Sequence, residues 1–259
     1  MALDPRKTKQ TVIAIIFFLI VGGLGFWIYR TVNPVKPIPT PPPTANLTPV
    51  QVIYAKLFNI QNNDYDFIAK VTNPNTDYGS PTVNYQITFS NSAGVQVGTK
   101  TGSFYILPGQ TKYVIQTPIK FSEPVALALM TIKSIDWQKL NPVAASGVNL
   151  FVRNPNFISV NQQGVFSKVG GSILNNSDFD LNKVDLNIVL LDQDNTPIAV
   201  NKTDLMTFLA KTTRGFEVTW FKPFVGQVNR VDVEANTNVF ENSNFLRLYG
   251  GQEKFKQQY

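Results

Sequence analysis

Hydrophobic and polar residues follow two different patterns along this chain. Thr11–Tyr29 is uncharged and almost entirely apolar. As a helix rising ~1.5 Å per residue it would span ~29 Å, close to the ~30 Å hydrocarbon core of a bilayer. From Val50 onward, short apolar runs alternate with turn residues. Val83–Phe89 is the clearest run, because every second residue is apolar, as in a half-buried strand. The pattern predicts a single transmembrane helix followed by an all-β region.

The charges around the apolar stretch predict its orientation. Three basic residues lie in residues 1–10, and two lie in residues 30–49. Lys and Arg in short flanks stay on the cytoplasmic side of a membrane. We therefore expect a single-pass protein of the cytoplasmic membrane with its N-terminus inside and its C-terminal region extracytoplasmic. The residues assigned to the membrane anchor are Thr11, Ile15, Phe18, Val21, Trp27 and Tyr29.

A cleaved secretory signal is the alternative to a retained anchor. The apolar stretch is longer than the usual 7–15-residue core of a signal peptide, and no A-x-A-like cleavage site follows it. The chain has no cysteine, which excludes a lipoprotein anchor. These observations favour a retained signal-anchor.

Residues 30–49 form a proline-rich spacer between the anchor and the β region. Proline fixes φ and removes a hydrogen-bond donor, so Pro34–Pro49 favours an extended polyproline II conformation. At ~3.1 Å per residue the spacer would hold the next domain up to ~50 Å from the membrane. A PxxP ligand for an SH3-like groove is the alternative interpretation.

The remaining sequence predicts two tandem antiparallel β-sandwiches of immunoglobulin-like type. Apolar runs recur at roughly 10-residue spacing between turn signals, which is typical of sandwiches. We place the first sandwich at residues 50–140, a linker at 141–147 and the second sandwich at 148–240. Residues 241–259 are a C-terminal tail, whose last seven residues we expect to be frayed.

The two predicted sandwiches repeat the same order of apolar positions and turns, which indicates a tandem duplication. The offset between equivalent positions is about 102 residues, with slips of one residue. The matching pairs are Val71–Asn73 with Ile173–Asn175, Val83–Val97 with Val184–Ile198, Ile106–Thr111 with Phe208–Thr213, and Thr111–Thr117 with Thr213–Trp220.

Composition limits the chemistry that the chain can perform. Hydrophobic residues make up 43% and aromatic residues 12%, enough for packed cores, whereas only 15% are charged. Cysteine and histidine are absent, so disulfides, thiolate chemistry and the commonest general base and metal ligand are excluded. The net charge of +6 is scattered along the chain, without the concentrated basic face of a nucleic-acid-binding protein. We expect no cofactor, no nucleic acid and no small-molecule substrate.

Carboxylate pairs are the remaining candidates for chemistry. Asp64 with Asp66, and Asp178 with Asp180, are spaced to share a face if they lie on strands. Such pairs can serve acid–base catalysis or bind a metal. Asp192–Asn195 resembles the start of a calcium loop, but the Gly and closing Glu of an EF-hand do not follow. Solvated loops and a hairpin turn are the favoured interpretations, so we predict no catalytic and no metal site.

Two weaker motifs depend on adjacency alone. Ser167 and Lys168 are neighbours, which does not establish a Ser–Lys dyad. Three N-glycosylation acceptor patterns occur in a chain rich in Asn and Thr, and they matter only in a host that glycosylates. The patterns begin at Asn46, Asn175 and Asn201.

The repeated unit is similar to the bacterial FxLYD and related LEA-type-2/WHy β-sandwich domains. The matching pattern is a strand ending in Asn, an alternating strand, an Asp/Asn/Gly turn and a strand after a Pro-Gly-type corner. In the second copy Ala210-Lys211 replaces Pro-Gly. The quoted segments are Val71–Asn73, Val83–Phe89, Ser92–Gly94 and Leu107–Thr111, and then Ile173–Asn175, Val184–Leu190, Asp192–Asn195 and Leu209–Thr213. The resemblance implies Ig-like, membrane-tethered envelope modules mostly without assigned activity, and no catalytic residue carries over.

These observations lead to a functional hypothesis with two alternatives. The first is a non-enzymatic, membrane-anchored extracytoplasmic scaffold or protein-interaction module of a bacterial cell envelope. The second is a binding module for cell-wall glycan or another anionic envelope polymer, suggested by the positive charge and the aromatic residues. The third is an enzyme that uses carboxylates alone.

Overall fold

The computed structural model divides the chain into two compact units, Met1–Asn46 and Leu47–Tyr259. In the first unit, residues 18–24 and 26 are helical, with exposed side chains, and Phe18 and Val21 of the predicted anchor belong to them. No helix among the described residues is long and apolar enough to cross a membrane. The predicted anchor residues Thr11, Ile15, Trp27 and Tyr29, and the spacer up to residue 45, lie outside the described residues. The structure describes residues 18–24, 26, 46–140, 147–162, 164–242, 245 and 250–259.

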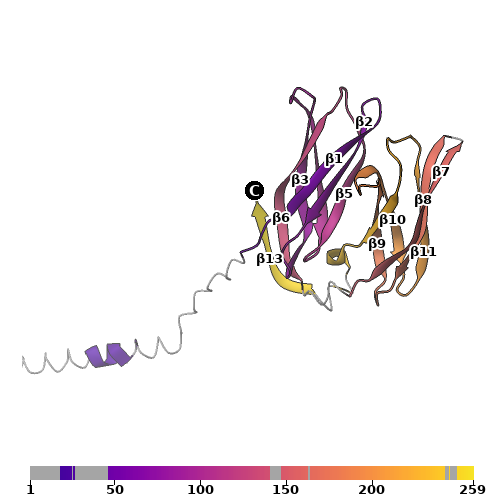
Figure 1. The fold of residues 1–259 in the computed structure, drawn as a ribbon. Helices are drawn as coiled ribbons and strands as arrows, with labels where there is room; N and C mark the ends of the chain where they lie inside the picture. The colour runs from indigo at the N-terminus through magenta and orange to yellow at the C-terminus, as the bar shows by residue number, and fades with distance from the viewer. Residues whose placement is uncertain are drawn as a thin grey trace, which may run out of the picture. The chain divides into compact units, whose positions relative to one another are not determined.

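The second unit consists of antiparallel strands in four sheets (Figure 1). This agrees with the prediction of an all-β region. The elements are β1 (Gln51–Gln61), β2 (Asp64–Thr72), β3 (Tyr78–Ser90), β4 (Gln96–Ile106), β5 (Thr111–Lys120), β6 (Leu127–Leu140), β7 (Leu150–Gln162), β8 (Val165–Asn175), β9 (Leu181–Leu191), β10 (Pro197–Phe208), β11 (Thr213–Trp220), β12 (Arg230–Asn236), the 3-10 helix η1 (Val239–Glu241) and β13 (Gly250–Gln258).

The first sandwich packs the sheet β1-β2-β5 against the sheet β13-β6-β3-β4 around one hydrophobic core. On β3, the residues Val83, Tyr85, Ile87 and Phe89 are each at most 1% exposed. The residues between them are only partly buried. The predicted alternation on this strand is therefore confirmed, because one face of β3 forms the core and the other does not.

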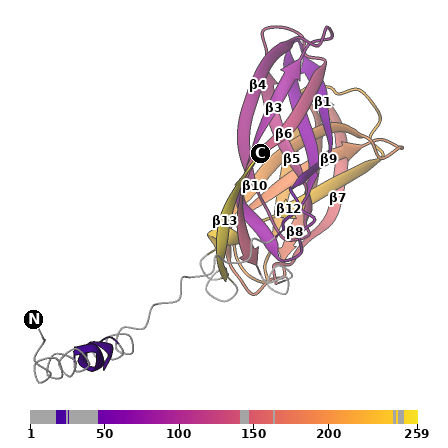
Figure 2. The ribbon, with the colours of Figure 1, turned by 90° about the vertical axis from the view of Figure 1, so that its left-hand side faces the viewer.

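The last strand of the first sandwich comes from the end of the chain. β13 pairs antiparallel with β6, from Gly250 opposite Leu140 to Gln258 opposite Ser134, and it lies at the margin of the first sandwich (Figures 1 and 2). The indole Nε1 of Trp137 donates to Gln257 Oε1 at 2.9 Å. The prediction of a frayed tail is wrong for these residues, because the backbone groups of β6 pair with them.

The second sandwich repeats the strand order of the first. β7, β8 and β11 occupy the places of β1, β2 and β5, and the sheet β10-β9-β12 matches β4-β3-β6. Its core lies between the sheets and also includes Val239, Phe240 and Phe245 from the segment after β12. Both sheets of the second sandwich therefore have the same strand order as the corresponding sheets of the first, as expected if the two units arose by the duplication that the sequence predicts.

Two buried asparagines hold equivalent corners of the two sandwiches. Asn73 is 1% exposed, and its Nδ2 donates to the carbonyls of Tyr78 and Leu107. Asn175 is 0% exposed, and its Nδ2 donates to the carbonyls of Phe179, Phe208 and Leu209. Each side chain thus satisfies backbone carbonyls that the sheets leave unpaired at this corner. The recurring strand-end Asn in the sequence therefore has a structural role.

Candidate functional site

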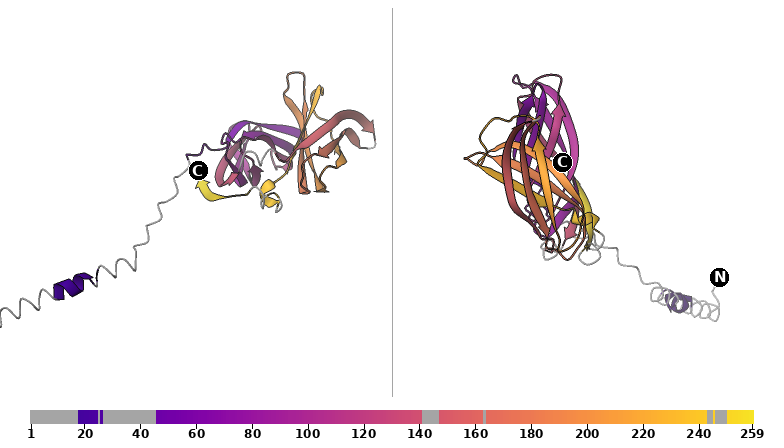
Figure 3. Two further views of the ribbon diagram at one scale, coloured as in Figure 1. Left: turned by 90° about the horizontal axis from the view of Figure 1, so that it is seen from below. Right: turned by 90° about the vertical axis from the view of Figure 1, so that its right-hand side faces the viewer.

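The two sandwiches pack against each other through the outer faces of two sheets. A second set of apolar side chains on β2 and β5 meets one on β9 and β10, and Figure 3 shows the two sandwiches side by side. This contact explains why Ile188–Leu191 is apolar at every position. Ile188 and Leu190 enter the core of the second sandwich, whereas Val189 and Leu191 enter the interface. The buried side chains of this apolar contact are Ile68, Tyr113, Ile115, Val189, Leu191 and Val200.

Hydrogen bonds surround the apolar contact and fix the orientation of the sandwiches. Lys56 Nζ donates to the Pro197 carbonyl at 2.8 Å, and Lys202 Nζ donates to the Ile115 carbonyl at 3.1 Å. Each bond joins a side chain of one sandwich to the backbone of the other. Asn187 Nδ2 likewise donates to the Tyr113 carbonyl at 3.1 Å, and a bond between two side chains joins Gln110 Nε2 to Asn236 Oδ1 at 2.7 Å.

A polar cluster occupies one part of this interface. Glu234 on β12 accepts the backbone N–H of Tyr113 through Oε2 at 2.7 Å, and Asp232 accepts the Tyr113 hydroxyl at 3.0 Å. Asp185 on β9 accepts the hydroxyl of Tyr105 at 3.1 Å. Burial raises the pKa of the Tyr105 and Tyr113 hydroxyls, and it also raises the pKa of the Glu234 carboxyl. The first sandwich therefore donates these three hydrogen bonds, and carboxylates of the second accept them.

Lys112 is the buried cation of this cluster. It is 5% exposed, and its Nζ lies 3.7 Å from the centroid of the Tyr105 ring. Burial lowers the pKa of Lys112 to about 8, although the nearby carboxylates of Glu234 and Asp185 oppose the change. Among the described residues, its ammonium has no hydrogen-bond acceptor and no ion pair, which is unusual for a buried lysine.

A cavity of about 410 Å³ opens beside Lys112 between β4 and β5 of the first sandwich and β9 and β10 of the second. We call it the lysine cavity. Burial of the Lys202 ammonium and the neighbouring Lys100 lower the pKa of Lys202. The charged residues that line the lysine cavity are Lys112, Lys183, Lys202, Asp185 and Asp204. Its neutral polar lining residues include Ser103, Gln116, Asn187 and Thr203.

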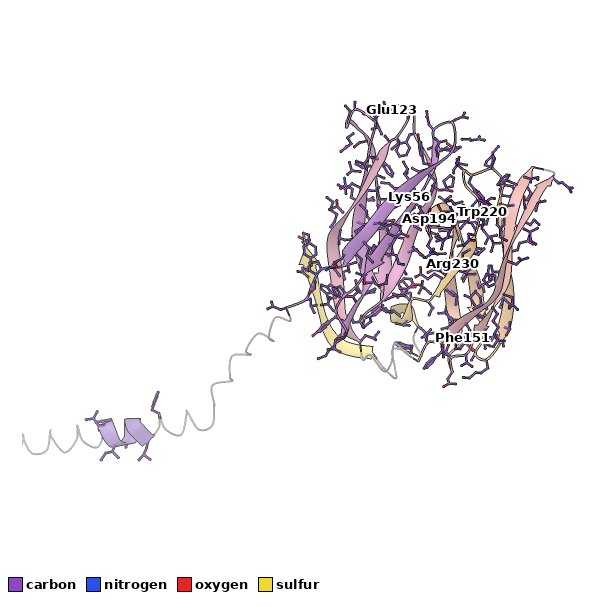
Figure 4. All side chains as sticks on the ribbon, in the orientation of Figure 1. Lys56, Glu123, Phe151, Asp194, Trp220 and Arg230 are labelled. Atoms are coloured by element: carbon purple, nitrogen blue, oxygen red, sulfur yellow. The ribbon has the colours of Figure 1, made fainter. Side chains whose placement is uncertain are left out.

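A second opening lies elsewhere along the interface and shares no lining residue with the lysine cavity. Two cavities of about 300 and 240 Å³ have Ile60, Asp66, Trp220 and Lys222 in common. We call the pair the apolar cleft. Lys56 of the first sandwich and Trp220 of the second both line it, and both are labelled in Figure 4. The segment 221–225 after β11 forms its rim.

The apolar cleft combines exposed apolar side chains with one buried carboxyl group. Phe221 is 66% exposed and Val225 is 92% exposed, whereas Trp220 is only 7% exposed. Asp66 is 7% exposed and accepts a hydrogen bond from the Thr117 hydroxyl. Burial raises the pKa of Asp66 to about 6, against the opposing effect of that hydrogen bond. The Asp66 carboxyl therefore titrates close to neutral pH.

The carboxylate pairs singled out in the sequence have different surroundings. Asp64 and Asp66 both line the apolar cleft, and Asp64 lies 3.9 Å from Lys120. Asp178 forms an ion pair with Lys211 at 2.8 Å, and Asp180 accepts the Ala210 backbone N–H at 2.8 Å. Only the first pair therefore lines one of the cavities described here.

The remaining sequence motifs have structural roles. Asp192 Oδ1 accepts the backbone N–H groups of Asp194 and Thr196, as Asn91 does in the equivalent turn of the first sandwich, so this segment is a hairpin turn. Ser167 is fully buried, whereas Lys168 pairs with Glu217 at 2.9 Å, so they point away from each other.

The three glycosylation patterns are not equally accessible. Asn175 is fully buried and hydrogen-bonded, so this pattern is closed to a modifying enzyme in the folded protein. Asn201 is partly buried, and its Nδ2 donates to the Thr219 carbonyl at 3.1 Å. Asn46 is exposed.

Sequence reasoning did not identify Lys112, Trp220 or Glu234 as members of a site. Lys112 carried one available signal, because it is a charged residue directly before the apolar run Tyr113–Ile115 of β5. In the part of the chain that the structure describes, no three Asp or Glu side chains gather as a metal site would require. Comparison with protein-family models finds no match, and comparison with curated protein sequences finds no relative.

Proposed function

We propose that this chain is a non-enzymatic protein-interaction module, anchored in a bacterial cytoplasmic membrane by Thr11–Tyr29 and exposed on the extracytoplasmic side. The uncharged length of that stretch and its basic N-terminal flank support the anchor. The proline-rich segment acts as a stiff spacer. The two domains are immunoglobulin-like sandwiches, which is supported by sheets that group the first, second and fifth strands of each repeat.

The observation that carries the interaction function is the apolar cleft. Large apolar side chains on a surface, rimmed by polar groups, are typical of protein-interaction surfaces. Phe221 and Val225 are mostly exposed at the rim, with Lys56 and Lys222 beside them. Asp66 lies among the lining residues and offers a carboxylate. The partner that fits is a protein segment that inserts an apolar side chain next to a basic one.

The packing of the two sandwiches against each other supports this assignment. The cleft takes Ile60 and Asp66 from the first sandwich and Trp220 and Lys222 from the second. A partner therefore meets a surface that exists only when both sandwiches are folded and packed together. Such preorganised surfaces avoid the ordering cost that weakens flexible interfaces.

Site-specific photo-cross-linking in native membranes tests the proposal. The full-length protein would carry a photoreactive phenylalanine analogue at Val225, or at Glu123 as an exposed control in the first sandwich. We expect a discrete protein adduct from position 225 that is absent at position 123 and is lost when Phe221→Ser is added. No adduct at position 225, or identical adducts from both positions, would contradict docking at this cleft.

A further inference from the structure

The lysine cavity contains a charged group, Lys112, that makes no hydrogen bond to any of the described protein groups. An ammonium has three donors, and a lysine that is 5% exposed has little access to bulk water. The Tyr105 ring contacts Lys112 through its π face at 3.7 Å, which stabilises the charge but provides no lone pair for a directed hydrogen bond. Acceptors for Lys112 must therefore come from water or from a ligand in the cavity.

The nearby carboxylates do not fill this role. Both oxygens of Glu234 already accept hydrogen bonds, from the Tyr113 backbone and from Asn236 Nδ2 at 2.5 Å. Both oxygens of Asp185 are also engaged, by the Tyr105 hydroxyl and by Lys183 at 2.8 Å. These groups provide long-range attraction for the Lys112 charge, but neither lies within ion-pair distance of it.

A second cation lies at the rim of the same cavity. Lys202 donates one hydrogen bond to the Ile115 carbonyl and keeps two further donors. Lys183 forms an ion pair with Asp185 at 2.8 Å, so Lys112 and Lys202 are the lysines of the described lining whose charge has no ion-pair partner. Neutral groups on the wall, Ser103 and Thr203 among them, offer hydroxyl groups beside the two ammonium groups. The volume of about 410 Å³ is within the usual range of ligand sites.

We propose that the lysine cavity binds an oxyanion, a carboxylate or phosphate group, held by the Lys112 ammonium inside the cavity and attracted by Lys202 at its rim. Charge-assisted hydrogen bonds from ammonium to oxyanion are among the stronger polar contacts in proteins. The cavity shares no lining residue with the apolar cleft, so this site is independent of the proposed protein docking. The oxyanion can be a free ion or a group carried by an anionic envelope polymer.

Titration calorimetry with the full-length protein in detergent micelles tests the site. The probes are inorganic phosphate, acetate and poly(glycerol phosphate), each compared with sodium chloride at equal ionic strength. The test variant is Lys112→Met, which keeps the side-chain volume and needs no acceptor. The matched control is Lys120→Met on the same strand, where the side chain is 76% exposed and far less constrained.

We expect saturable binding of at least one oxyanion probe to the wild type and to Lys120→Met, weakened at least tenfold in Lys112→Met. Tighter binding of poly(glycerol phosphate), per phosphate group, assigns the site to a polymer, and binding of phosphate or acetate alone assigns it to a free ion. Absence of saturable binding, equal binding by Lys112→Met, or the same heat from chloride would overturn the proposal. If Lys112→Met does not fold, Lys202→Met at the rim decides, because unchanged affinity there also refutes the site.

Discussion

Replacement of Asp66 by Asn is expected to stabilise the protein at neutral pH. The carboxyl is 7% exposed, and burial raises its pKa from 3.8 to about 6. Because one pKa unit corresponds to about 1.36 kcal/mol, this rise corresponds to about 3 kcal/mol. The folded state holds the proton more tightly than the unfolded state does. The contribution of this group to stability is therefore complete below pH 3.8 and is lost as the pH rises through about 6.

Asn removes the charge but keeps an oxygen that accepts from the Thr117 hydroxyl. We therefore expect Asp66→Asn to match the wild type near pH 4 and to exceed it at pH 8 by up to about 3 kcal/mol in free energy of unfolding. Urea denaturation of the full-length protein, followed by tryptophan fluorescence from pH 4 to pH 8, measures the difference. Asp194→Asn, at an exposed turn position, controls for the loss of one negative charge.

The pH dependence distinguishes this reasoning from its alternatives. A difference that grows between pH 4 and pH 7 only in Asp66→Asn supports a buried, costly carboxylate. If Asp66→Asn is instead less stable than the wild type at pH 8, the ionised carboxylate has a favourable partner and the cost of burial has been overstated. A constant difference at every pH would mean that Asp66 does not titrate in this range.

Four further substitutions test the packing and the polar cluster by urea or thermal denaturation. Asn175→Ala should cost about 3 kcal/mol, because the buried carbonyls of Phe179 and Phe208 lose their donor, and Asn73→Ala should cost less, because the bonds that it loses are only partly buried. A loss below about 1 kcal/mol in Asn175→Ala would contradict the corner role. Gly102→Ala should cost about 1–3 kcal/mol, since its Cβ would lie 2.4 Å from the Tyr85 hydroxyl oxygen, and an unchanged stability would show that the ring moves freely. Lys112→Met should melt at the same or a higher temperature at pH 7, because an apolar side chain avoids the desolvation of a buried charge, and a strong loss would mean that Glu234 needs the cation.

Strand-level features were predictable because they depend on local periodicity. The alternation at Val83–Phe89 places every second side chain in the core, and the structure buries these residues as predicted. The composition of Asp192–Asn195 predicted a hairpin turn. In the structure the Asp192 side chain accepts two backbone N–H groups of that turn. The recurrence of Asn73 and Asn175 was also visible in the sequence, although the carbonyls that they bind were not.

The candidate sites could not be predicted in the same way. Asp66 was visible as a carboxylate, but its burial depends on Trp220 and other residues more than 100 positions away. Lys112 and Glu234 approach each other only because two sheet faces pack together. Continuous apolar runs such as Ile188–Leu191 gave a usable signal of burial on both faces, although they do not identify the opposing sheet.

By itself, the sequence determined an all-β region with two repeated units, since hydrophobic period and turn residues are local properties. It also confined the chemistry to carboxylates, amines and hydroxyls, because cysteine and histidine are absent. Only the tertiary structure decided that Gly250–Gln258 completes the first sandwich, and that the sandwiches pack through β2, β5, β9 and β10. Such contacts join residues far apart in sequence, and their selection depends on how whole sheet faces fit rather than on any local pattern.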